Sequence, residues 1–192
     1  GAETRPAEAF AANAFAVRSL ARAADACAAT LVHYGTDFVF FDSAGNRPYT
    51  EEAPAAPRSV YAASKLAGDW FALEAARSYV LRVESLFGTP RGFQGRLGTL
   101  EKIVATIEAG GEAAVFTDRV VSPSYVEDVA LATRHLLTSG AAHGLYHCVN
   151  SGTATWYELA REIGRALGVD PRLRPVSVAD RSEEHTSELQ SH

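Results

Sequence analysis

The stretch "ATLVHYGTDFVF", residues 29–40, is rich in β-branched and aromatic residues and predicts a buried β-strand. Apolar residues before it repeat at helical spacing and predict a helix from about residue 6 to 28. After it come a long loop (42–58), a second helix (about 59–77) and a second buried strand, "SYVLRVESLFG" (78–88). This alternation predicts an α/β fold with a parallel sheet and right-handed crossovers.

The second half of the chain continues with shorter elements. A helix with Leu100, Ile103, Val104 and Ile107 on one face is followed by a strand at 112–116. The next helix runs from a capping box at Ser124 and Glu127 to about Leu137, and a strand at 144–150 follows it. The last helix begins at a capping box at Thr155 and Glu158 and ends at Gly168. The sequence shows no internal repeat.

Composition and charge restrict the classes of protein to which this chain can belong. Of the 192 residues, 47% are hydrophobic and 21% are charged, as in soluble globular domains. The net charge of −5 disfavours nucleic acid as a partner, because nucleic-acid-binding surfaces are basic. The apolar runs are too short for a membrane span. The two cysteines, Cys27 and Cys148, lie in apolar contexts, so we expect buried thiols rather than a disulfide, and a cytoplasmic protein.

A candidate reactive pair lies in "SVYAASKLAGDW", residues 59–70, where Tyr61 and Lys65 are four residues apart. On a helix this spacing places both side chains on one face, with Cβ atoms about 6 Å apart. The Lys65 ammonium would lower the pKa of Tyr61, so that the phenol could exchange a proton with a hydroxyl or carbonyl oxygen. The ammonium also offers three donors suited to a ribose diol. An isolated pair of this kind is more often an ordinary part of a helix surface.

Thr36 adds a third group to this pair. It lies near the end of the predicted strand, and ligands of open α/β sheets bind at the carboxyl ends of parallel strands. The strand and the helix that carries Tyr61 are consecutive, and the long loop between them can cover the pair. Thr36 alone is compatible with a structural hydroxyl. With Tyr61 and Lys65 it describes a hydroxyl, an acid and a cation at one end of the sheet.

Six blocks, in this order, resemble the dTDP-4-dehydrorhamnose reductase family of the extended short-chain dehydrogenase/reductase superfamily. They are "NAFAVRSLARAA", "HYGTDFVF", "RPYTEEAPAAPRSVYAASKLAGDW", "LRVESLFG", "SPSYVEDVA" and "GLYHCVNSGTATWYELAREIG", and they cover nearly all of residues 8–175. The resemblance implies the C-terminal part of a Rossmann-like doubly wound parallel sheet plus a smaller α/β substrate-binding region. Residues 1–90 would form the second half of the dinucleotide-binding domain, and 91–180 would mainly bind substrate.

The resemblance also implies a function in bacterial dTDP-rhamnose biosynthesis. An NADPH-dependent oxidoreductase, with NADH as the other candidate cofactor, would reduce a nucleotide-linked 4-keto-6-deoxy sugar while Tyr61 protonates the keto oxygen. Lys65 would hold the nicotinamide ribose, and Thr36 would hydrogen-bond the reacting oxygen. Asn13 matches a polar position that supports the lysine, or else it is a satisfied core amide. A homodimer is compatible with the resemblance.

The sequence departs from the family pattern in the cofactor site. The Gly-rich turn for the cofactor phosphates lies far upstream of the tyrosine in this superfamily, so we expect it and the first strands to precede residue 1 in the complete protein. Gly92, Gly95 and Gly98 have the spacing of such a turn but follow Tyr61, and we expect this region to border the sugar nucleotide instead. The present segment alone should therefore bind NADPH poorly and be inactive.

Two single positions also differ from the pattern. Ser85 stands where well-studied members have a Trp that contacts the sugar and the nicotinamide, so the resemblance implies that Ser85 lies at the cofactor. Because serine cannot stack, the exact substrate is left open. Gly35 stands where many relatives have a Ser beside Thr36, which removes one hydroxyl from the site.

Two alternative functions remain open. Sugar-nucleotide epimerases and dehydratases share the superfamily, but dehydratases carry Asp-Glu directly after the threonine. Here Thr36 is followed by Asp37 and Phe38, which counts against dehydration. The other alternative is a non-catalytic binding subunit, similar to the regulatory partner of methionine adenosyltransferase. The presence of Thr36, Tyr61 and Lys65 together favours an enzyme.

Residues 181–192, "RSEEHTSELQSH", lack helical and strand periodicity. They resemble the translation of a common DNA sequencing adapter along their whole length, so we expect an artefactual or disordered tail, with a natural polar tail as the alternative. We therefore expect no metal site at His185 and His192, nor elsewhere in the chain.

Overall fold

The computed structural model describes residues 1–41, 48–88 and 97–178; the tail at 181–192 and Gly92 and Gly95 lie outside this part. Along the chain the elements are η1 (Ala2–Thr4), α1 (Pro6–Phe10), η2 (Ala11–Phe15), α2 (Ala16–Ala26), β1 (Leu31–Thr36), η3 (Asp37–Val39), α3 (Val60–Leu73), β2 (Ser78–Val83), α4 (Thr99–Glu108), β3 (Glu112–Phe116), β4 (Val120–Val121), α5 (Val126–Ser139), β5 (Gly144–His147), β6 (Ala154–Thr155), α6 (Trp156–Leu167) and β7 (Arg172–Val176). The predicted α/β class is confirmed.

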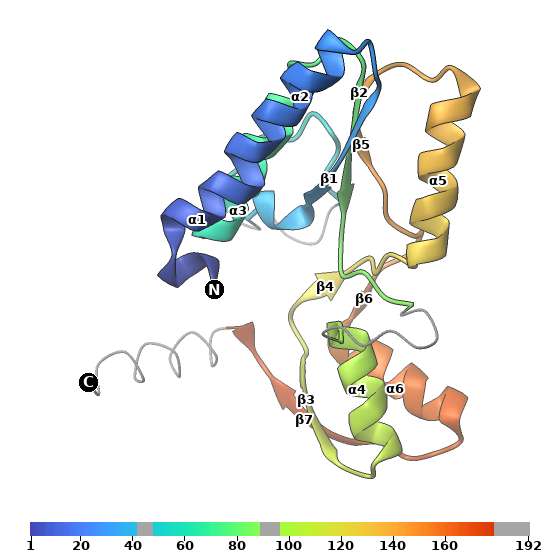
Figure 1. The fold of residues 1–192 in the computed structure, drawn as a ribbon. Coiled ribbons are helices and arrows are strands. Elements are labelled where there is room, and N and C mark those ends of the chain that lie inside the picture. The colour runs from blue at the N-terminus through green and yellow to red at the C-terminus, as the bar shows by residue number, and fades with distance from the viewer. Residues whose placement is uncertain (42–47, 89–96, 179–192) are drawn as a thin grey trace. The chain divides into compact units, whose positions relative to one another are not determined.

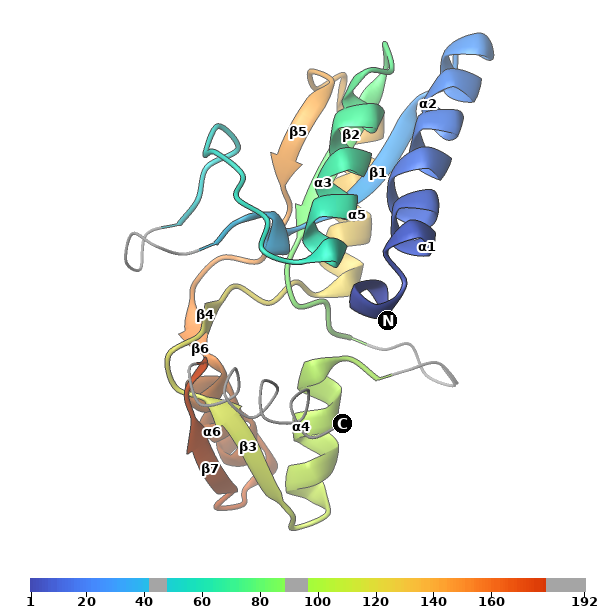
Figure 2. The ribbon, with the colours of Figure 1, turned by 90° about the vertical axis from the view of Figure 1, so that its left-hand side faces the viewer.

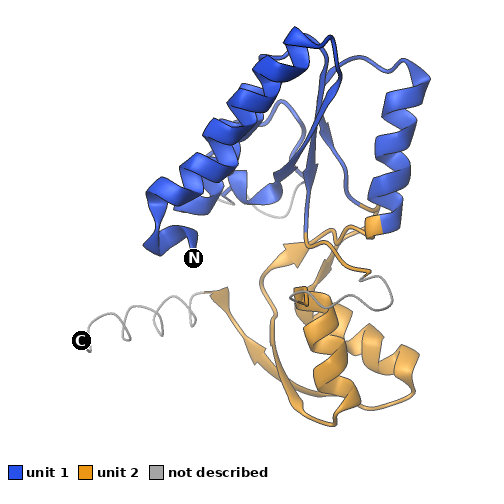
Figure 3. Ribbon diagram, viewed as in Figure 1, with its two compact units in different colours: residues 1–84, 127–149 blue, residues 85–126, 150–192 orange. Residues whose placement is uncertain are grey.

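The chain folds into two compact units, each built from two segments of sequence (Figure 3). The first unit comprises residues 1–84 and 127–149, and the second comprises 85–126 and 150–192. This division differs from the predicted linear boundary at residue 90. The physical reason is strand pairing, because β5 pairs with β2 and so returns α5 and β5 to the first unit. The functions assigned to the two parts stay predictions.

The first unit has three layers (Figures 1 and 2). Its sheet has the order β1-β2-β5 with both pairs parallel, and it lies between α2 and α3 on one face and α5 on the other. The central strand β2 is buried at all six positions, which fits its apolar sequence. Parallel strands end at one common edge of a sheet. In β1, β2 and β5 that edge is marked by Thr36, Val83 and His147.

Local geometry departs from the sequence-based prediction on both sides of β1. The predicted N-terminal helix contains a π-helical segment, η2, between α1 and α2. β1 ends at Thr36, earlier than predicted, although the following residues are equally apolar. The reason is a 3-10 turn over Asp37–Val39, whose N-cap is the Thr36 side chain.

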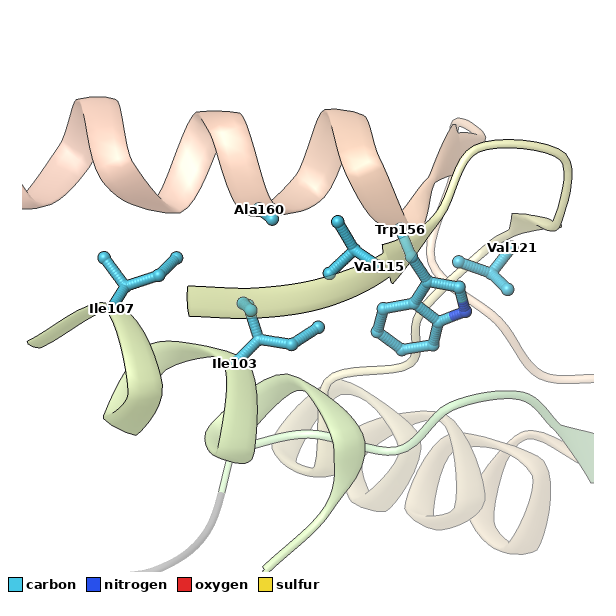
Figure 4. Close-up of a cluster of buried hydrophobic side chains, with 7 residues drawn as sticks. Ile103, Ile107, Val115, Val121, Trp156 and Ala160 are labelled. Atoms are coloured by element: carbon cyan, nitrogen blue, oxygen red, sulfur yellow. The ribbon is translucent and has the colours of Figure 1, made fainter. Parts of the chain in front are cut away.

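The second unit has its own apolar core (Figure 4). β3 and β7 pair in parallel, and α4 and α6 pack against β3. The buried members of this core are Ile103, Ile107, Ala113, Val115, Val121, Trp156 and Ala160. β7 has no counterpart among the sequence-based predictions. Its sequence "RLRPV" is mostly exposed and contains Pro175, which argues against a strand.

The two predicted capping boxes have different outcomes. At α6 the Thr155 hydroxyl accepts a hydrogen bond from Glu158 N at 3.1 Å, and the Glu158 carboxylate accepts one from Thr155 N at 2.7 Å, which confirms the box. Gly168 ends α6 with a φ of 70°, as predicted for a left-handed C-cap. α5, in contrast, begins at Val126, one residue later than a cap at Ser124 would place it.

Both cysteines are free thiols, in agreement with the prediction. Cys148 is partly buried, whereas Cys27 is exposed. The prediction of a buried Cys27 was wrong because this residue is the C-cap of α2 rather than a member of its buried face, which Val17 and Ala21 form.

Candidate functional site

Thr36 ends β1 at the carboxyl edge of the sheet and is only 5% exposed. Its hydroxyl accepts a hydrogen bond from Phe38 N at 3.3 Å and donates one to Asp37 Oδ1 at 3.2 Å. These two bonds cap the turn that follows the strand and so fix the hydroxyl at the strand end.

Tyr61 is the second residue of α3, and two side chains hold the start of this helix. Ser59 is the N-cap and accepts a hydrogen bond from Ala62 N at 3.1 Å. The Glu3 carboxylate accepts hydrogen bonds from Val60 N at 2.9 Å and Tyr61 N at 3.1 Å, donors that lack an intrahelical partner. These bonds lower the pKa of Glu3. Sequence reasoning missed Glu3, because nothing in its neighbourhood indicates a contact with a distant helix.

The phenol of Tyr61 shares a hydrogen bond with the Thr36 side chain, and its ring meets Phe38 edge to face at 6.0 Å between centroids. Burial raises the pKa of Tyr61, the bond to Thr36 opposes this rise, and the charges of Asp37 and Asp69 add to it. The predicted lowering of this pKa was therefore wrong for the structure described, because partial burial and the two carboxylates together outweigh the bond to Thr36. Tyr61 keeps its proton at neutral pH.

Lys65 follows Tyr61 by one helical turn. Its Nζ donates a hydrogen bond to the backbone oxygen of Tyr34 in β1 at 2.5 Å. Burial lowers the pKa of Lys65, and the Asp69 carboxylate opposes this effect. The structure thus brings Thr36, Tyr61 and Lys65 to neighbouring positions on β1 and α3.

Asn13 lies in the π-helical segment η2, which packs against α3. Its side-chain nitrogen donates a hydrogen bond to Ser64 Oγ at 3.0 Å, and Ser64 Oγ donates to Tyr61 O at 2.8 Å. The backbone carbonyl oxygen of Asn13 approaches α3 so closely that a Cβ at Gly68 would lie 2.1 Å from it. The Asn13 side chain thus bonds Ser64, the residue that precedes Lys65.

A buried ionic cluster lies beside these groups. Asp69 is 0% exposed and follows Lys65 by one turn of α3. Its Oδ2 accepts a hydrogen bond from Arg82 Nε at 2.9 Å, and its Oδ1 lies 3.3 Å from His33 Nε2. Sequence reasoning missed this cluster, since the three residues come from three elements. The available signal was the repeat of polar groups at Tyr61, Lys65 and Asp69.

The loop between η3 and α3 is anchored at the same edge of the sheet. The rings of Phe40 and Tyr49 stack with centroids 4.4 Å apart, and His147 meets Phe40 edge to face at 5.5 Å. The Glu51 carboxylate accepts a hydrogen bond from His147 N at 2.8 Å, and the Arg82 guanidinium lies 5.2 Å from the centre of the Phe40 ring. These contacts hold the described part of the loop against the carboxyl ends of β2 and β5.

Ser85 is the first residue of the second unit and has a φ of 45°, in the left-handed region. Thr36, Tyr61 and Lys65 belong to the first unit, so the predicted contact of Ser85 with a cofactor stays a prediction. Gly98, the last glycine of the G-x-x-G-x-x-G spacing, is the N-cap of α4.

The described residues contain no group of three or more His, Cys, Asp or Glu side chains placed to hold a metal ion. Nor does any helix in the same part of the chain have the length and apolar character needed to cross a membrane. The candidate site offers a hydroxyl, a phenol and an ammonium group, which can position an oxygen atom and transfer a proton to it.

Comparison with known proteins places the chain in a family. Residues 1–191 match the family model described as RmlD substrate binding domain. The chain belongs to the RmlD family. A dTDP-4-dehydrorhamnose reductase from Streptomyces griseus is 36% identical to it over 183 residues, and one from Mycobacterium tuberculosis is 37% identical over 187 residues. These stretches cover 92% and 93% of the present chain.

Solved structures of RmlD relatives confirm the Rossmann-like fold. A dTDP-4-dehydrorhamnose reductase from Clostridium acetobutylicum superposes with a TM-score of 0.83 at 28% identity. One from Bacillus anthracis, described in complex with NADP, superposes with a TM-score of 0.80 at 31% identity. Each structural match covers 93% of the present chain.

The chain spans about three fifths of the length of these RmlD relatives. The shares are 58% and 59% for the two sequence relatives and 61% and 62% for the two structures. The relatives therefore contain residues that have no counterpart in the chain described.

Proposed function

We propose that the complete protein containing this chain reduces the keto group of a nucleotide-linked 4-keto-6-deoxy sugar, similar to dTDP-4-dehydrorhamnose, with NADPH as the reductant and NADH as the other candidate. The observation that carries this proposal is the grouping of Thr36, Tyr61 and Lys65 at the carboxyl end of β1 in a member of the RmlD family. The names of the relatives and the NADP complex of the Bacillus anthracis protein support the reaction class.

Tyr61 is the proton donor in this proposal. Burial raises its pKa, so the phenol carries a proton at neutral pH. The Thr36 hydroxyl has a single hydrogen, which it donates to Asp37 Oδ1 in the structure described; by turning this hydrogen to the substrate carbonyl oxygen it can hold that oxygen beside Tyr61 Oη. As negative charge develops on that oxygen, the proton passes to it from Tyr61 Oη. The resulting phenolate is stabilised by the Lys65 ammonium.

The nicotinamide end of the cofactor fits the chemistry of Lys65. When bound, NADPH supplies the hydride for the carbonyl carbon. The Lys65 ammonium has three hydrogens and makes one hydrogen bond within the part of the chain described, to Tyr34 O. The remaining donors suit the hydroxyls of the nicotinamide ribose. Ser85 is a further predicted contact of this end of the cofactor.

The arrangement favours reduction over dehydration. Dehydration needs a further acid–base carboxylate after Asp37, but that position holds Phe38, whose ring packs edge to face on Tyr61. A phenyl ring can neither donate nor accept the proton. A dTDP-glucose 4,6-dehydratase from Bacillus anthracis also superposes with a TM-score of 0.75, but at 23% identity this similarity concerns the fold alone.

The test is the Tyr61→Phe substitution in the full-length protein. NADPH oxidation is measured with a dTDP-4-keto-6-deoxy sugar as substrate. Removal of the phenol oxygen is expected to lower kcat by about 10²- to 10⁴-fold, the usual contribution of a general acid. Tyr157→Phe is the matched control, because Tyr157 lies on α6 in the second unit.

Two results would contradict the proposal. Full turnover by Tyr61→Phe would exclude this residue as the proton donor. A wild-type protein that binds the sugar nucleotide and NADPH but oxidises no NADPH would favour the non-catalytic binding subunit instead.

A further inference from the structure

A buried carboxylate lies one helical turn beyond the proposed proton donor and its lysine. Asp69 is fully buried, and the four-residue spacing places Tyr61, Lys65 and Asp69 along one face of α3. A buried carboxylate destabilises a protein core unless it is paired and hydrogen-bonded, and an apolar residue would often stabilise the core better. Its presence here therefore needs a physical reason beyond packing.

Two strands of the sheet supply the partners of Asp69. Arg82 on β2 donates a hydrogen bond through Nε to Oδ2 at 2.9 Å, and His33 on β1 brings Nε2 to 3.3 Å from Oδ1. The side chains of Arg82 and His33 are only 7% and 10% exposed. We call His33, Asp69 and Arg82 the carboxylate cluster. Its position is determined by three separate elements of the first unit.

Gly35 provides the space for this cluster. It lies on the same face of β1 as His33 and is the direct parallel partner of Arg82. A Cβ at position 35 would lie 2.7 Å from Asp69 Oδ1 and 2.9 Å from Arg82 Cγ, so a side chain there would displace the cluster. The next residue along the strand is Thr36. The cluster therefore lies next to the end of β1, where Thr36 carries the proposed oxygen-binding hydroxyl.

The carboxylate of Asp69 acts on both reactive side chains. It raises the pKa of Lys65 against the effect of burial, and it also raises the pKa of Tyr61. Among the described residues, three acidic groups lie near Tyr61 and Lys65, namely Asp37 on η3, Glu3 on η1 and Asp69 on α3 itself. His33 on β1 and Arg82 on β2 lie next to Asp69. Of these, Asp69 is the group that shifts the pKa of both Tyr61 and Lys65.

We propose that Asp69, hydrogen-bonded by Arg82 and placed beside His33, is a positioning residue that keeps Lys65 as an ammonium next to the Tyr61 phenol. It contacts neither substrate nor cofactor and acts through these two side chains. Its meaning for catalysis rests on the proposed reductase function. Its electrostatic effect on Tyr61 and Lys65 is independent of turnover and can be measured separately.

The test is Asp69→Asn in the full-length protein, a change that keeps the side-chain shape and an acceptor for Arg82 but removes the charge. The titrations of Tyr61 and Lys65 are followed by NMR of carbon-labelled tyrosine and lysine, with signals assigned from Tyr61→Phe and Lys65→Met. Both pKa values are expected to fall, each by about 1, the usual effect of a charge at this spacing. The alkaline limb of the pH profile of kcat/KM should move to lower pH by a similar amount.

Asp25→Asn is the matched control. The Asp25 carboxylate accepts a hydrogen bond from Ala76 N at 2.9 Å, just beyond the opposite end of α3. This variant makes the same chemical change in the same unit but far from the reactive pair, and both titrations should stay as in the wild type. Asp69→Glu, which restores the negative charge, should bring both pKa values back towards those of the wild type.

Unchanged titrations of Tyr61 and Lys65 in a folded Asp69→Asn protein would overturn the inference, whatever its activity. Shifted titrations in a protein that reduces no sugar nucleotide would support the inference and refute the proposed function. If Asp69→Asn does not fold, the double variant Asp69→Asn/Arg82→Gln removes both charges together. The double variant also lacks the Asp69 carboxylate, so both pKa values should fall in it too, and unchanged values would equally overturn the inference.

Discussion

The two units bury different kinds of core. In the second unit the described residues bury an apolar cluster formed by α4, β3, β4 and α6 and one polar side chain, that of Ser124. In the first unit the described residues also bury polar and charged side chains, namely Thr36, Ser64, Asp69, Ser78 and Arg82. The proposed reactive groups thus lie in the unit with the polar interior.

The difference between the two cores distinguishes burial that serves packing from burial that serves a chemical role. Apolar burial stabilises a fold by about 25 cal/mol per Å² and needs no particular partner. A buried ion pair, in contrast, needs good geometry and often stabilises a core no better than apolar residues would. The first unit retains the buried pair of Asp69 and Arg82 inside its sheet–helix layer, as expected if Asp69 has the positioning role proposed above.

The largest expected effect on stability is from Trp156→Ala in the apolar core. Trp156 is 5% exposed and belongs to that core, so its truncation should cost about 3–5 kcal/mol of unfolding free energy. Amide hydrogen exchange should report lost protection in β3 and β7, while the Tyr61 titration stays unchanged. An equal loss of protection in β1 and β2 would show that the two cores are not independent.

A smaller effect is expected from Gly35→Ser, which adds a side chain beside the carboxylate cluster. The new Cβ would overlap Asp69 Oδ1 and Arg82 Cγ, so overpacking should cost about 1–3 kcal/mol in urea unfolding and shift the Tyr61 titration. Ala130→Ser, at an exposed position of α5 in the same unit, is the control and should change neither. A neutral Gly35→Ser would show that the carboxylate cluster can move without loss.

Removal of the α6 cap should have a still smaller effect, confined to the second unit. Thr155→Ala deletes the oxygen that accepts a hydrogen bond from Glu158 N, and should cost about 1 kcal/mol in urea unfolding. Thr155→Ser keeps the hydroxyl and should stay close to the wild type. A loss in Thr155→Ser as large as in Thr155→Ala would mean that the methyl group, rather than the cap, carries the stability.

The smallest effect concerns Glu51 and appears only as pH dependence. The hydrogen bond from His147 N lowers the pKa of Glu51 below its ordinary value of 4.5. A carboxyl whose pKa is lower in the folded state stabilises the fold above its unfolded pKa, and this contribution is lost as the pH falls through the folded value. Glu51→Gln should therefore lose less stability than the wild type when the pH is lowered through and below 4.5. Identical acid unfolding curves for both proteins would contradict this prediction.

The elements that the sequence predicted share one property, which is that their signals are local. The helix and strand at Thr36 and Tyr61, the cap at Thr155 and the αL end at Gly168 each follow from spacing over a few residues. The four-residue spacing likewise put Lys65 beside Tyr61 on one face of a helix. Among the elements that the sequence missed, β7 pairs with β3 and the π-helical segment packs against α3, both distant in sequence.

The sequence by itself determined the α/β alternation through periodicity, the pair of Tyr61 and Lys65 through four-residue spacing, and the family through the resemblance of its ordered blocks, which also implied the role of Thr36. Only the tertiary structure decided the direction of the Tyr61 pKa, because desolvation depends on every element packed around the phenol. It likewise decided that β5 returns to the first sheet and that Asp69 meets partners from β1 and β2. Pairing between distant segments leaves no local pattern, since each residue fits its own helix or strand equally well without its partner.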